Sequence, residues 1–201
     1  MTVLVLDVGG VLCEDAVAPK VHELAGRYRL DEHDLLDEAR RLRSLVDTGA
    51  LSEAAFWERL LRERGVDPEA CDLSVASFAN PMPGARGLID YARHRGLRLA
   101  ALTNDSVELS AARQRALQAS GRFALIVVSA AIGITKPDPR IYRSVLSSLA
   151  VQPGECLFVD DRAENVDAAR GLGMRGIVFE SHTQVMAILA REGASGSRKP
   201  V

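Results

Sequence analysis

The chain has 201 residues, of which 47% are apolar and 26% are charged, and its formal net charge at pH 7 is −2. A chain of this length and composition can bury a hydrophobic core in one compact domain, or in one domain that carries a modest insertion. The slightly acidic balance offers no basic surface for nucleic acid, and no apolar run approaches the roughly 18 residues of a membrane span. We therefore expect neither nucleic acid nor a membrane as a partner.

The N-terminal residues and the cysteines bear on the compartment. Met1 is followed almost at once by the apolar run Val3–Leu6, without the basic region and long apolar region of a signal peptide. Cys13, Cys71 and Cys156 are odd in number and widely spaced, so they predict neither a disulfide framework nor a cysteine metal site. These features predict a cytoplasmic protein.

Short apolar segments alternate with segments of helical periodicity along most of the chain. Val3–Leu6 is an unbroken aliphatic run, which is typical of a strand covered on both faces. Similar runs occupy residues 97–102, 125–128, 156–159 and 177–179. Helical spacing occupies residues 85–95, 107–120, 139–149 and 163–172. The alternation predicts an α/β fold with a parallel, Rossmann-like sheet.

The stretch between the first two predicted strands is about ninety residues long, whereas a crossover between parallel strands needs roughly a dozen. Within it, apolar residues recur at intervals of three and four over residues 19–28, 31–46 and 52–64. Asp31 and Ser52 are suitable N-caps for the second and third of these segments. The stretch therefore predicts a small helical bundle inserted into the α/β fold.

These elements predict two domains and a tail. The segment Asn80–Gly84 is rich in proline and breaks helices, so it marks the return from the bundle to the sheet. The predicted divisions are an α/β core made of 1–15 and 82–192, a helical cap made of 16–81, and a disordered tail of small and polar residues at 193–201.

Reactive side chains follow the predicted strands at the points where the strands end. Asp7 follows the first strand, Thr103 and Asn104 follow the second, and Asp160 and Asp161 follow the fourth. Each of these residues would be an ordinary turn or N-cap if it stood alone. Because ligands of open parallel sheets bind beyond the carboxyl ends of the strands, we expect these side chains to converge around one point.

Lys136, in the segment Lys136–Pro139 ahead of a predicted helix, belongs to the same group. The other lysines are Lys20 and Lys199, and all other residues with a permanent positive charge are arginines. A lysine provides a compact positive charge that a planar guanidinium does not reproduce. Three carboxylates, a hydroxyl, an amide and a lysine at one sheet edge match the needs of phosphoryl transfer, which are a carboxylate nucleophile, ligands for a divalent metal and donors to phosphate oxygens.

The residues divide between metal binding and phosphate binding. We expect Asp7 and Asp161 to supply carboxylate oxygens to Mg²⁺, with the backbone carbonyl of Gly9 and waters completing an octahedron. The groups expected to bind the phosphoryl oxygens are Lys136, the hydroxyl of Thr103, and the backbone N–H groups of Gly10 and Asn104. Gly10 lacks a Cβ, so its backbone can approach an anion closely.

Four segments resemble, in chain order, the four motifs of the haloacid dehalogenase superfamily. They are Asp7–Leu12, Leu102–Asn104, Gly133–Tyr142, and Phe158–Asp161 with Asn165. The stretch Thr48–Trp57 is similar to the subgroup with a helical cap between the first and second motifs, which includes sugar-phosphate phosphatases and the N-terminal phosphatase domain of soluble epoxide hydrolase. The resemblance implies that Asp7 attacks phosphorus to form an aspartyl-phosphate, which water hydrolyses. It also implies that Asp160 acts beside the metal ligands or through a water, and that Asn165 orients its neighbours.

Gly9 departs from this pattern. Phosphatases of the superfamily usually carry an aspartate two residues after the nucleophile, where it protonates the leaving group and later activates water. General acid/base catalysis is typically worth about 10² to 10⁴ in rate, so its loss is serious. The metal ligand expected at this position is a backbone carbonyl, which glycine retains.

Three functions remain open. The first is a Mg²⁺-dependent phosphatase for small-molecule phosphates, sugar phosphates among them. Either the substrate has a good leaving group, as anomeric sugar phosphates and acyl phosphates do, or another group or a water handles the proton. The second is a catalytically weak relative that binds a phosphorylated ligand or protein partner. The third is a haloacid dehalogenase, which also lacks that aspartate but does not need a metal site at Asp160 and Asp161. We expect the first, as a monomer or homodimer, and predict that Gly9→Asp accelerates poor leaving groups more than good ones.

Overall fold

The computed structural model describes residues 2–15, 17–119 and 121–195. It contains a five-stranded parallel sheet with the strand order β3-β2-β1-β4-β5. The strands are β1 (Val3–Leu6), β2 (Arg98–Thr103), β3 (Leu125–Val128), β4 (Cys156–Asp160) and β5 (Arg175–Val178). The predicted α/β fold with a Rossmann-like parallel sheet is confirmed.

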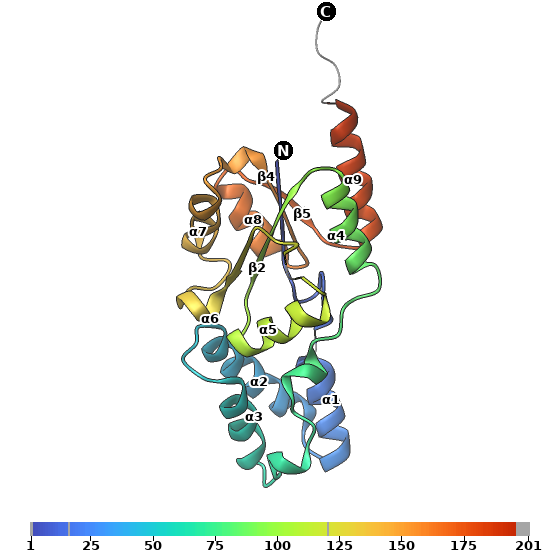
Figure 1. Cartoon of the computed structure of the whole chain (residues 1–201). Helices are drawn as coiled ribbons and strands as arrows, with labels where there is room; N and C mark the ends of the chain where they lie inside the picture. Colours follow the sequence, from blue (N-terminus) through green and yellow to red (C-terminus); the bar gives the residue numbers. More distant parts are fainter. Residues whose placement is uncertain (1, 16, 120, 196–201) are drawn as a thin grey trace, which may run out of the picture.

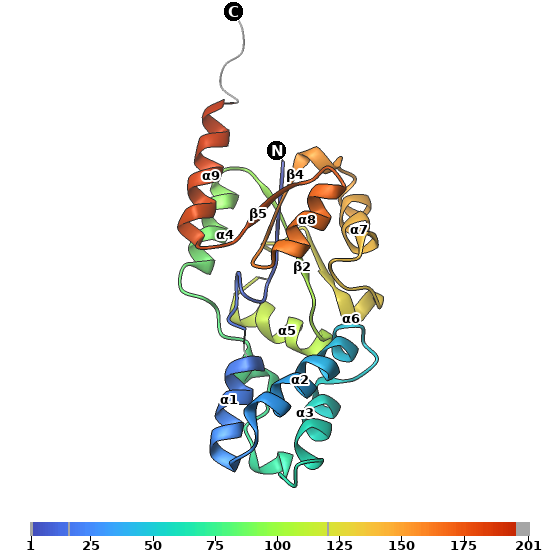
Figure 2. The same ribbon diagram turned by 180° about the vertical axis from the view of Figure 1, so that it is seen from behind.

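Helices cover both faces of the sheet (Figure 1, Figure 2). Those on one face are α4 (Ala85–His94) and α9 (His182–Ser195), and those on the other are α7 (Pro139–Leu149) and α8 (Ala163–Gly171). On β1, Leu4 and Leu6 join the apolar cluster of α4 and α9. Val3 and Val5 join the cluster of α7 and α8. The first strand is apolar at every position because both of its faces are buried.

The element boundaries differ from the sequence expectation in three places. β5 begins at Arg175, earlier than the predicted run, because its ladder with β4 starts at the pair Leu157–Arg175. Helix α5 (Val107–Ala116) ends before the predicted end at 120. Helix α9 was not predicted and continues to Ser195, into the segment expected to be a disordered tail, because extending a formed helix costs much less than nucleating one. Residues 196–201 of that expected tail lie outside the described residues.

The inserted segment forms a helical unit at the lower end of the molecule in Figure 1. Its helices are α1 (Val17–Tyr28), α2 (Glu32–Asp47) and α3 (Glu53–Arg62), followed by the 3₁₀ turns η1 (Pro68–Ala70) and η2 (Val75–Phe78). These elements share an apolar cluster of their own, in which Leu24, Leu42 and Trp57 are fully or almost fully buried. Asp31 and Ser52 cap α2 and α3 by accepting backbone N–H groups. We propose that 16–81 form a cap and that 1–15 with 82–192 form the core.

Two contacts hold the helical unit against the carboxyl edge of the sheet. Leu109 of α5 belongs to the same apolar cluster as α1–α3. Gly49, in the turn after α2, has φ of +76° and lies against the carbonyl of Ala130 in α6 (Ser129–Ile132). A Cβ at Gly49 would lie 2.6 Å from that carbonyl oxygen, so the approach requires glycine.

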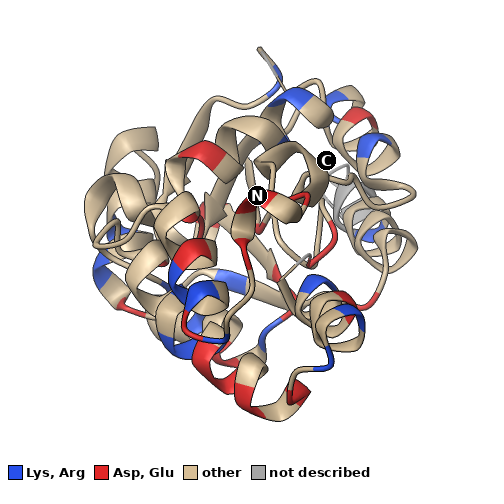
Figure 3. Ribbon diagram, turned by 90° about the horizontal axis from the view of Figure 1, so that it is seen from below, with Lys and Arg blue, Asp and Glu red and all other residues tan. Residues whose placement is uncertain are grey.

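Charged side chains of both signs are spread over the molecule. Figure 3, which looks at the end formed by the helical unit, shows basic and acidic positions interspersed along the same helices. Some of them form pairs one turn apart, such as Arg62 with Glu58. Within the described ranges, no helix combines the length and the apolar character needed to cross a membrane.

Candidate active site

Asp7 is the first residue after β1 and lies at the carboxyl edge of the sheet. It is only 6% exposed. Its Oδ1 accepts the N–H of Val8 at 2.6 Å and lies 2.7 Å from Nζ of Lys136. Burial raises the pKa of Asp7 to about 7, Lys136 lowers it in part, and Asp160 raises it. A carboxylate nucleophile has to be ionised, so a second cation beside Asp7 would complete this arrangement.

Lys136 bridges two carboxylates. Its Nζ lies 2.7 Å from Oδ1 of Asp7 and 2.7 Å from Oδ2 of Asp160. Asn104 holds its backbone, since Nδ2 donates to the Lys136 carbonyl at 3.0 Å and Oδ1 accepts the Lys136 N–H at 2.8 Å. Burial lowers the pKa of Lys136, but the two carboxylates together outweigh it and the net shift is upward. The lysine is therefore a fixed positive charge at the end of β1.

Asp160 is fully buried, and both of its carboxylate oxygens are engaged. Oδ2 accepts from Lys136, while Oδ1 accepts the N–H of Arg162 and the Nδ2 amide of Asn165, each at 2.9 Å. A carboxylate held in this way is suited to positioning Lys136. The remaining amide oxygen of Asn165, Oδ1, is buried without a hydrogen-bond partner in the described part of the chain.

Asp161 completes an acidic cluster that fits a divalent cation. One carboxylate oxygen from each of Asp7, Asp160 and Asp161 lies within 4.8 Å of the others. Asp161 is exposed, and its carboxylate occupies the place where a Cβ of Gly10, at φ +74°, would lie. Burial and the neighbouring Asp160 raise the pKa of Asp161. A set of carboxylate oxygens suits Mg²⁺, and Asn165, whose buried Oδ1 has no partner in the described part of the chain, lines the same pocket.

Two of the expected phosphate-binding groups are engaged with other partners. The N–H of Gly10 donates to the carbonyl of Cys13 at 2.8 Å, closing the turn after β1, so the predicted contact with phosphate requires this hydrogen bond to break. The hydroxyl of Thr103 donates to Oδ2 of Asp105 at 3.0 Å. A hydroxyl has one proton, so Thr103 can donate to a phosphate oxygen only after turning away from Asp105. The backbone N–H of Asn104 stays a predicted donor.

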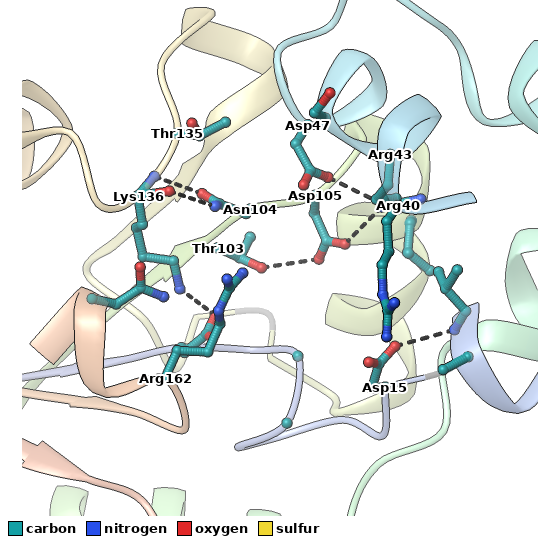
Figure 4. A pocket seen from close by; sticks show the side chains of 18 of the residues that line it. Asp15, Arg40, Arg43, Asp47, Thr103, Asn104, Asp105, Thr135, Lys136 and Arg162 are labelled. Carbon is teal, nitrogen blue, oxygen red and sulfur yellow. Dashed lines mark hydrogen bonds and ion pairs between the residues drawn. The ribbon is translucent and has the colours of Figure 1, made fainter. Parts of the chain in front are cut away.

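These residues open into a pocket of about 960 Å³ between the sheet edge and the helical unit. This volume lies within the range of small-molecule sites. Asp7, Thr103 and Lys136 line the side of the sheet. The facing wall comes from α2 and includes Arg40, Arg43, Ser44, Asp47 and Thr48. Figure 4 shows Arg40 and Arg43 from this wall reaching toward the loops that follow the strands.

A second group of charged residues, centred on Asp105, was not anticipated from the sequence. Asp105 is 1% exposed and accepts from Nη1 of Arg113 at 2.9 and 3.2 Å and from Nη2 of Arg43 at 3.4 Å. Arg43 also contacts Glu53 at 2.7 and 2.8 Å and Asp47 at 3.1 Å. Burial raises the pKa of Asp47 to about 6, although Arg43 opposes the rise. Figure 4 shows Asp47 and Asp105 on the same side of Arg43, each joined to it by a dashed line, so one arginine links the helical unit to the core.

Sequence reasoning offered little to identify this group. Arg113 stands in a helix that carries other arginines, and no motif separates a buried arginine from an exposed one. The available signal was Asp105, which directly follows Thr103 and Asn104 and precedes the N-cap Ser106. A charged residue at the carboxyl end of a strand deserved the same inspection as Asp7.

The fold places a carboxylate, Asp7, at the end of the first strand, with Lys136 and Asp160–Asp161 beside it. This arrangement is characteristic of one class of α/β enzymes. The sequence model of the haloacid dehalogenase-like hydrolases matches residues 1–173, and the chain belongs to this family.

Named relatives and a solved structure add to this assignment. A phosphatase from Mycobacterium tuberculosis is 36% identical over 159 residues, which are 76% of this chain and 71% of that protein. A phosphoserine phosphatase from Thermus thermophilus is 34% identical over 135 residues, 64% of this chain and 54% of that protein. A haloacid dehalogenase family enzyme from Bacteroides thetaiotaomicron, solved with magnesium and inorganic phosphate, superposes with a TM-score of 0.70 at 19% identity, covering 92% of this chain and 98% of that one. At this identity the likeness concerns the fold.

Proposed function

We propose that the protein is a Mg²⁺-dependent phosphatase that hydrolyses the phosphate monoester of a small polar molecule. The observation that carries the proposal is the buried Asp7, which lies 2.7 Å from Lys136 at the floor of the pocket and beside the exposed carboxylate of Asp161. A nucleophile, a fixed cation and a free carboxylate in one cavity are the parts that phosphoryl transfer to an aspartate needs. Family membership and the phosphatase names of the relatives support the same reaction.

The first step is attack of a carboxylate oxygen of Asp7 on phosphorus, with cleavage of the bond to the leaving oxygen. Lys136 lowers the pKa of Asp7 in part, which favours the ionised form, and it places positive charge beside the phosphoryl oxygens. Asp7, Asp161 and the carbonyl of Gly9 would hold Mg²⁺, which would supply the further positive charge that offsets repulsion between a carboxylate and a phosphate dianion. Water then attacks the phosphorus of the aspartyl-phosphate, Asp7 leaves as a carboxylate, and a water proton ends on the released phosphate.

Asp160 takes part as a positioning residue. Its two oxygens hold Lys136 on one side and the N–H of Arg162 with the amide of Asn165 on the other. The position of the ammonium relative to Asp7 therefore depends on Asp160 rather than on the flexible lysine stem alone. Thr103 and the backbone N–H of Asn104 complete the phosphate-binding groups in this proposal, once the Thr103 hydroxyl turns from Asp105.

The composition of the pocket supports a polar substrate such as a sugar phosphate. The wall from α2 includes two arginines, Arg40 and Arg43, together with hydroxyl groups of Ser44 and Thr48. The remaining donors of Arg40 and the lone pairs of the two hydroxyl oxygens, whose protons are donated to backbone carbonyls, offer hydrogen bonds to the hydroxyls of a polar molecule.

A second function, binding of a phosphorylated ligand with little turnover, is favoured by one feature of the site. The feature is Gly9, which offers no acid to protonate a leaving group. The test below separates the two functions, because a binder retains affinity for phosphate without releasing it from an ester.

Phosphate release from a panel of esters, including sugar 1-phosphates, tests the proposal in the presence of Mg²⁺. We expect release by the wild type and loss of at least about 10³-fold in Asp7→Asn, since the amide cannot form the intermediate. Asp167→Asn, an identical change on the exposed side of α8, is the matched control and should retain activity. Phosphate binding without release from any ester would support the binder instead, and halide release from a haloacid without metal would support a dehalogenase.

A further inference from the structure

The space around position 9, rather than the backbone conformation there, explains why this residue is glycine. Gly9 is not among the glycines with positive φ, so its backbone conformation is open to other residues. A Cβ built on it would lie 3.1 Å from Nη1 of Arg113 and 3.9 Å from its Cζ and Nη2. A guanidinium thus fills the space that a side chain at position 9, two residues after the nucleophile Asp7, would occupy.

Arg113 is held firmly at this position. It is 5% exposed and projects from α5 one turn after Leu109, which packs against the helical unit. Its Nη1 donates to both oxygens of Asp105, and its Nη2 donates to the carbonyl of Glu14 at 3.0 Å. Its Nε is buried without a partner in the described part of the chain, so the protein does not use every donor of this guanidinium. Arg113 and Gly9 both line the pocket.

The location of α5 sets the side of the substrate that Arg113 faces. Figure 1 and Figure 2 both place α5 between the sheet edge and the helical unit. In an in-line displacement the leaving oxygen points away from the nucleophile. With phosphorus against Asp7 at the sheet edge, the leaving oxygen points into the pocket that Arg113 helps to line.

A guanidinium acts differently from a carboxylic acid in that place. Arginine does not give up its proton in proteins, so Arg113 is no general acid. A fixed cation with unused N–H groups, buried away from water, instead stabilises negative charge as it develops on an oxygen.

We propose that Arg113 is the catalytic residue on the leaving-group side, and that it stabilises the departing oxygen as an anion without transferring a proton. The substrates that suit this site are phosphate esters and anhydrides whose leaving oxygen forms a stable anion, with acyl phosphates as the extreme case. The inference rests on the phosphatase function proposed above and specifies the substrate class.

The proposed step balances without a proton donor. The bond between a carboxylate oxygen of Asp7 and phosphorus forms, and the bond between phosphorus and the leaving oxygen breaks. Both electrons of the broken bond remain on the leaving oxygen, whose negative charge is paired with Arg113 until release. The leaving group takes a proton from water only after it has left the pocket.

Rates for a series of leaving groups measure how strongly Arg113 stabilises negative charge on the leaving oxygen. We would determine kcat/KM with Mg²⁺ for 2,4-dinitrophenyl, 4-nitrophenyl, phenyl and alkyl phosphates in the wild type, Arg113→Gln and Arg113→Lys. Loss of one preorganised donor costs about 10² to 10³ in rate when charge develops fully, so we expect Arg113→Gln to lose about 10²-fold on the poorest leaving group and less than about threefold on the best. Arg113→Lys, which keeps the charge, should recover part of the difference.

Arg122→Gln is the matched control, because Arg122 also forms a partly buried ion pair, with Asp90, but does not line the pocket. It should leave the dependence on the leaving group unchanged. Should Arg113→Gln fail to fold, the double variant Asp105→Asn with Arg113→Gln removes both charges of the pair and repeats the test.

The outcomes separate the two proposals. A wild type that hydrolyses the series, with equal losses in Arg113→Gln for every leaving group, would refute the role of Arg113 and leave the phosphatase function intact. A wild type that releases phosphate from no member would overturn both. A steeper dependence in Arg113→Gln, absent from Arg122→Gln, would establish the inference.

Discussion

The substitution Gly9→Asp introduces the aspartate that the resemblance leads us to expect two residues after the nucleophile, and the structure changes the expected effect of this substitution. The new Cβ would lie 3.1 Å from Nη1 of Arg113, closer than most such contacts, so the guanidinium has to shift by a few tenths of an ångström. The added carboxylate would then lie within ion-pairing distance of Arg113. We expect the pair to hold the new aspartate in its ionised form, which makes it a poor proton donor.

The size of this effect follows from the pKa of an aspartate beside an arginine. Such a neighbour lowers the pKa by about 1 to 3 units from an ordinary value of about 3.9, so at pH 7 the protonated fraction falls from about 10⁻³ to roughly 10⁻⁴–10⁻⁶. General acid catalysis at full strength is worth about 10² to 10⁴. We therefore expect Gly9→Asp alone to leave kcat/KM on phenyl phosphate unchanged within about twofold, and to raise it by up to about tenfold when added to Arg113→Gln.

A double-mutant cycle checks this expectation. The four proteins are the wild type, Gly9→Asp, Arg113→Gln and the double variant, each assayed on phenyl and 2,4-dinitrophenyl phosphate. Gly9→Asn in both backgrounds is the control for volume, because it fills the same space without a titrating group. If Gly9→Asp gives the same gain with and without Arg113, the guanidinium does not face residue 9 and the reasoning fails.

Three further changes probe the metal site, the buried charges and the cap. Lys136→Met should lower the free energy of unfolding in urea by about 3 to 5 kcal/mol at pH 7, because it leaves two buried carboxylates without their cation. Adding Asp160→Asn should recover part of that loss, and no recovery would contradict the ion-pair account. Asp161→Asn should abolish the rise in thermal stability that Mg²⁺ gives the wild type, about 2.7 kcal/mol at 100 times the dissociation constant, and an unchanged rise would place the metal elsewhere. Burial raises the pKa of Asp47 from 3.8 to about 6, so Asp47 binds its proton more tightly in the folded state than in the unfolded state. The folded protein therefore loses stability as the pH rises from 4 to 6. The unfolding free energy of the wild type minus that of Asp47→Asn should fall by about 2 kcal/mol between pH 4 and pH 7, and a pH-independent difference would contradict this shift.

The α/β fold was predictable because apolar periodicity reports burial on each face. The run Val3–Leu6 is apolar at every position, and the structure covers it on both sides with helices. Helix α9 was missed because its apolar residues form the continuous run Val185–Ala190, and periodicity alone does not distinguish a helix from a strand in such a run. The strand order β3-β2-β1-β4-β5 was not predicted, because apolar runs carry no information about which strands are neighbours.

The convergence of the site residues followed from the parallel sheet, whereas their hydrogen bonds did not. Strands that run in one direction bring Asp7 and Asp160 to the same edge whatever their partners are. The engagement of the Gly10 N–H with Cys13, and of the Thr103 hydroxyl with Asp105, depends on turn geometry and side-chain rotamers. These are decided by local packing after the fold has formed.

The sequence by itself determined that Asp7 follows a buried strand, that Lys136 and the acidic pair belong to the same edge, and that position 9 has no side chain. Only the tertiary structure decided what fills that position. Arg113 is more than one hundred residues from Gly9 along the chain, and it reaches Gly9 because α5 packs against the helical unit through Leu109 and because Asp105 binds its guanidinium. Contact between residues so far apart depends on how whole elements pack, which no local pattern records.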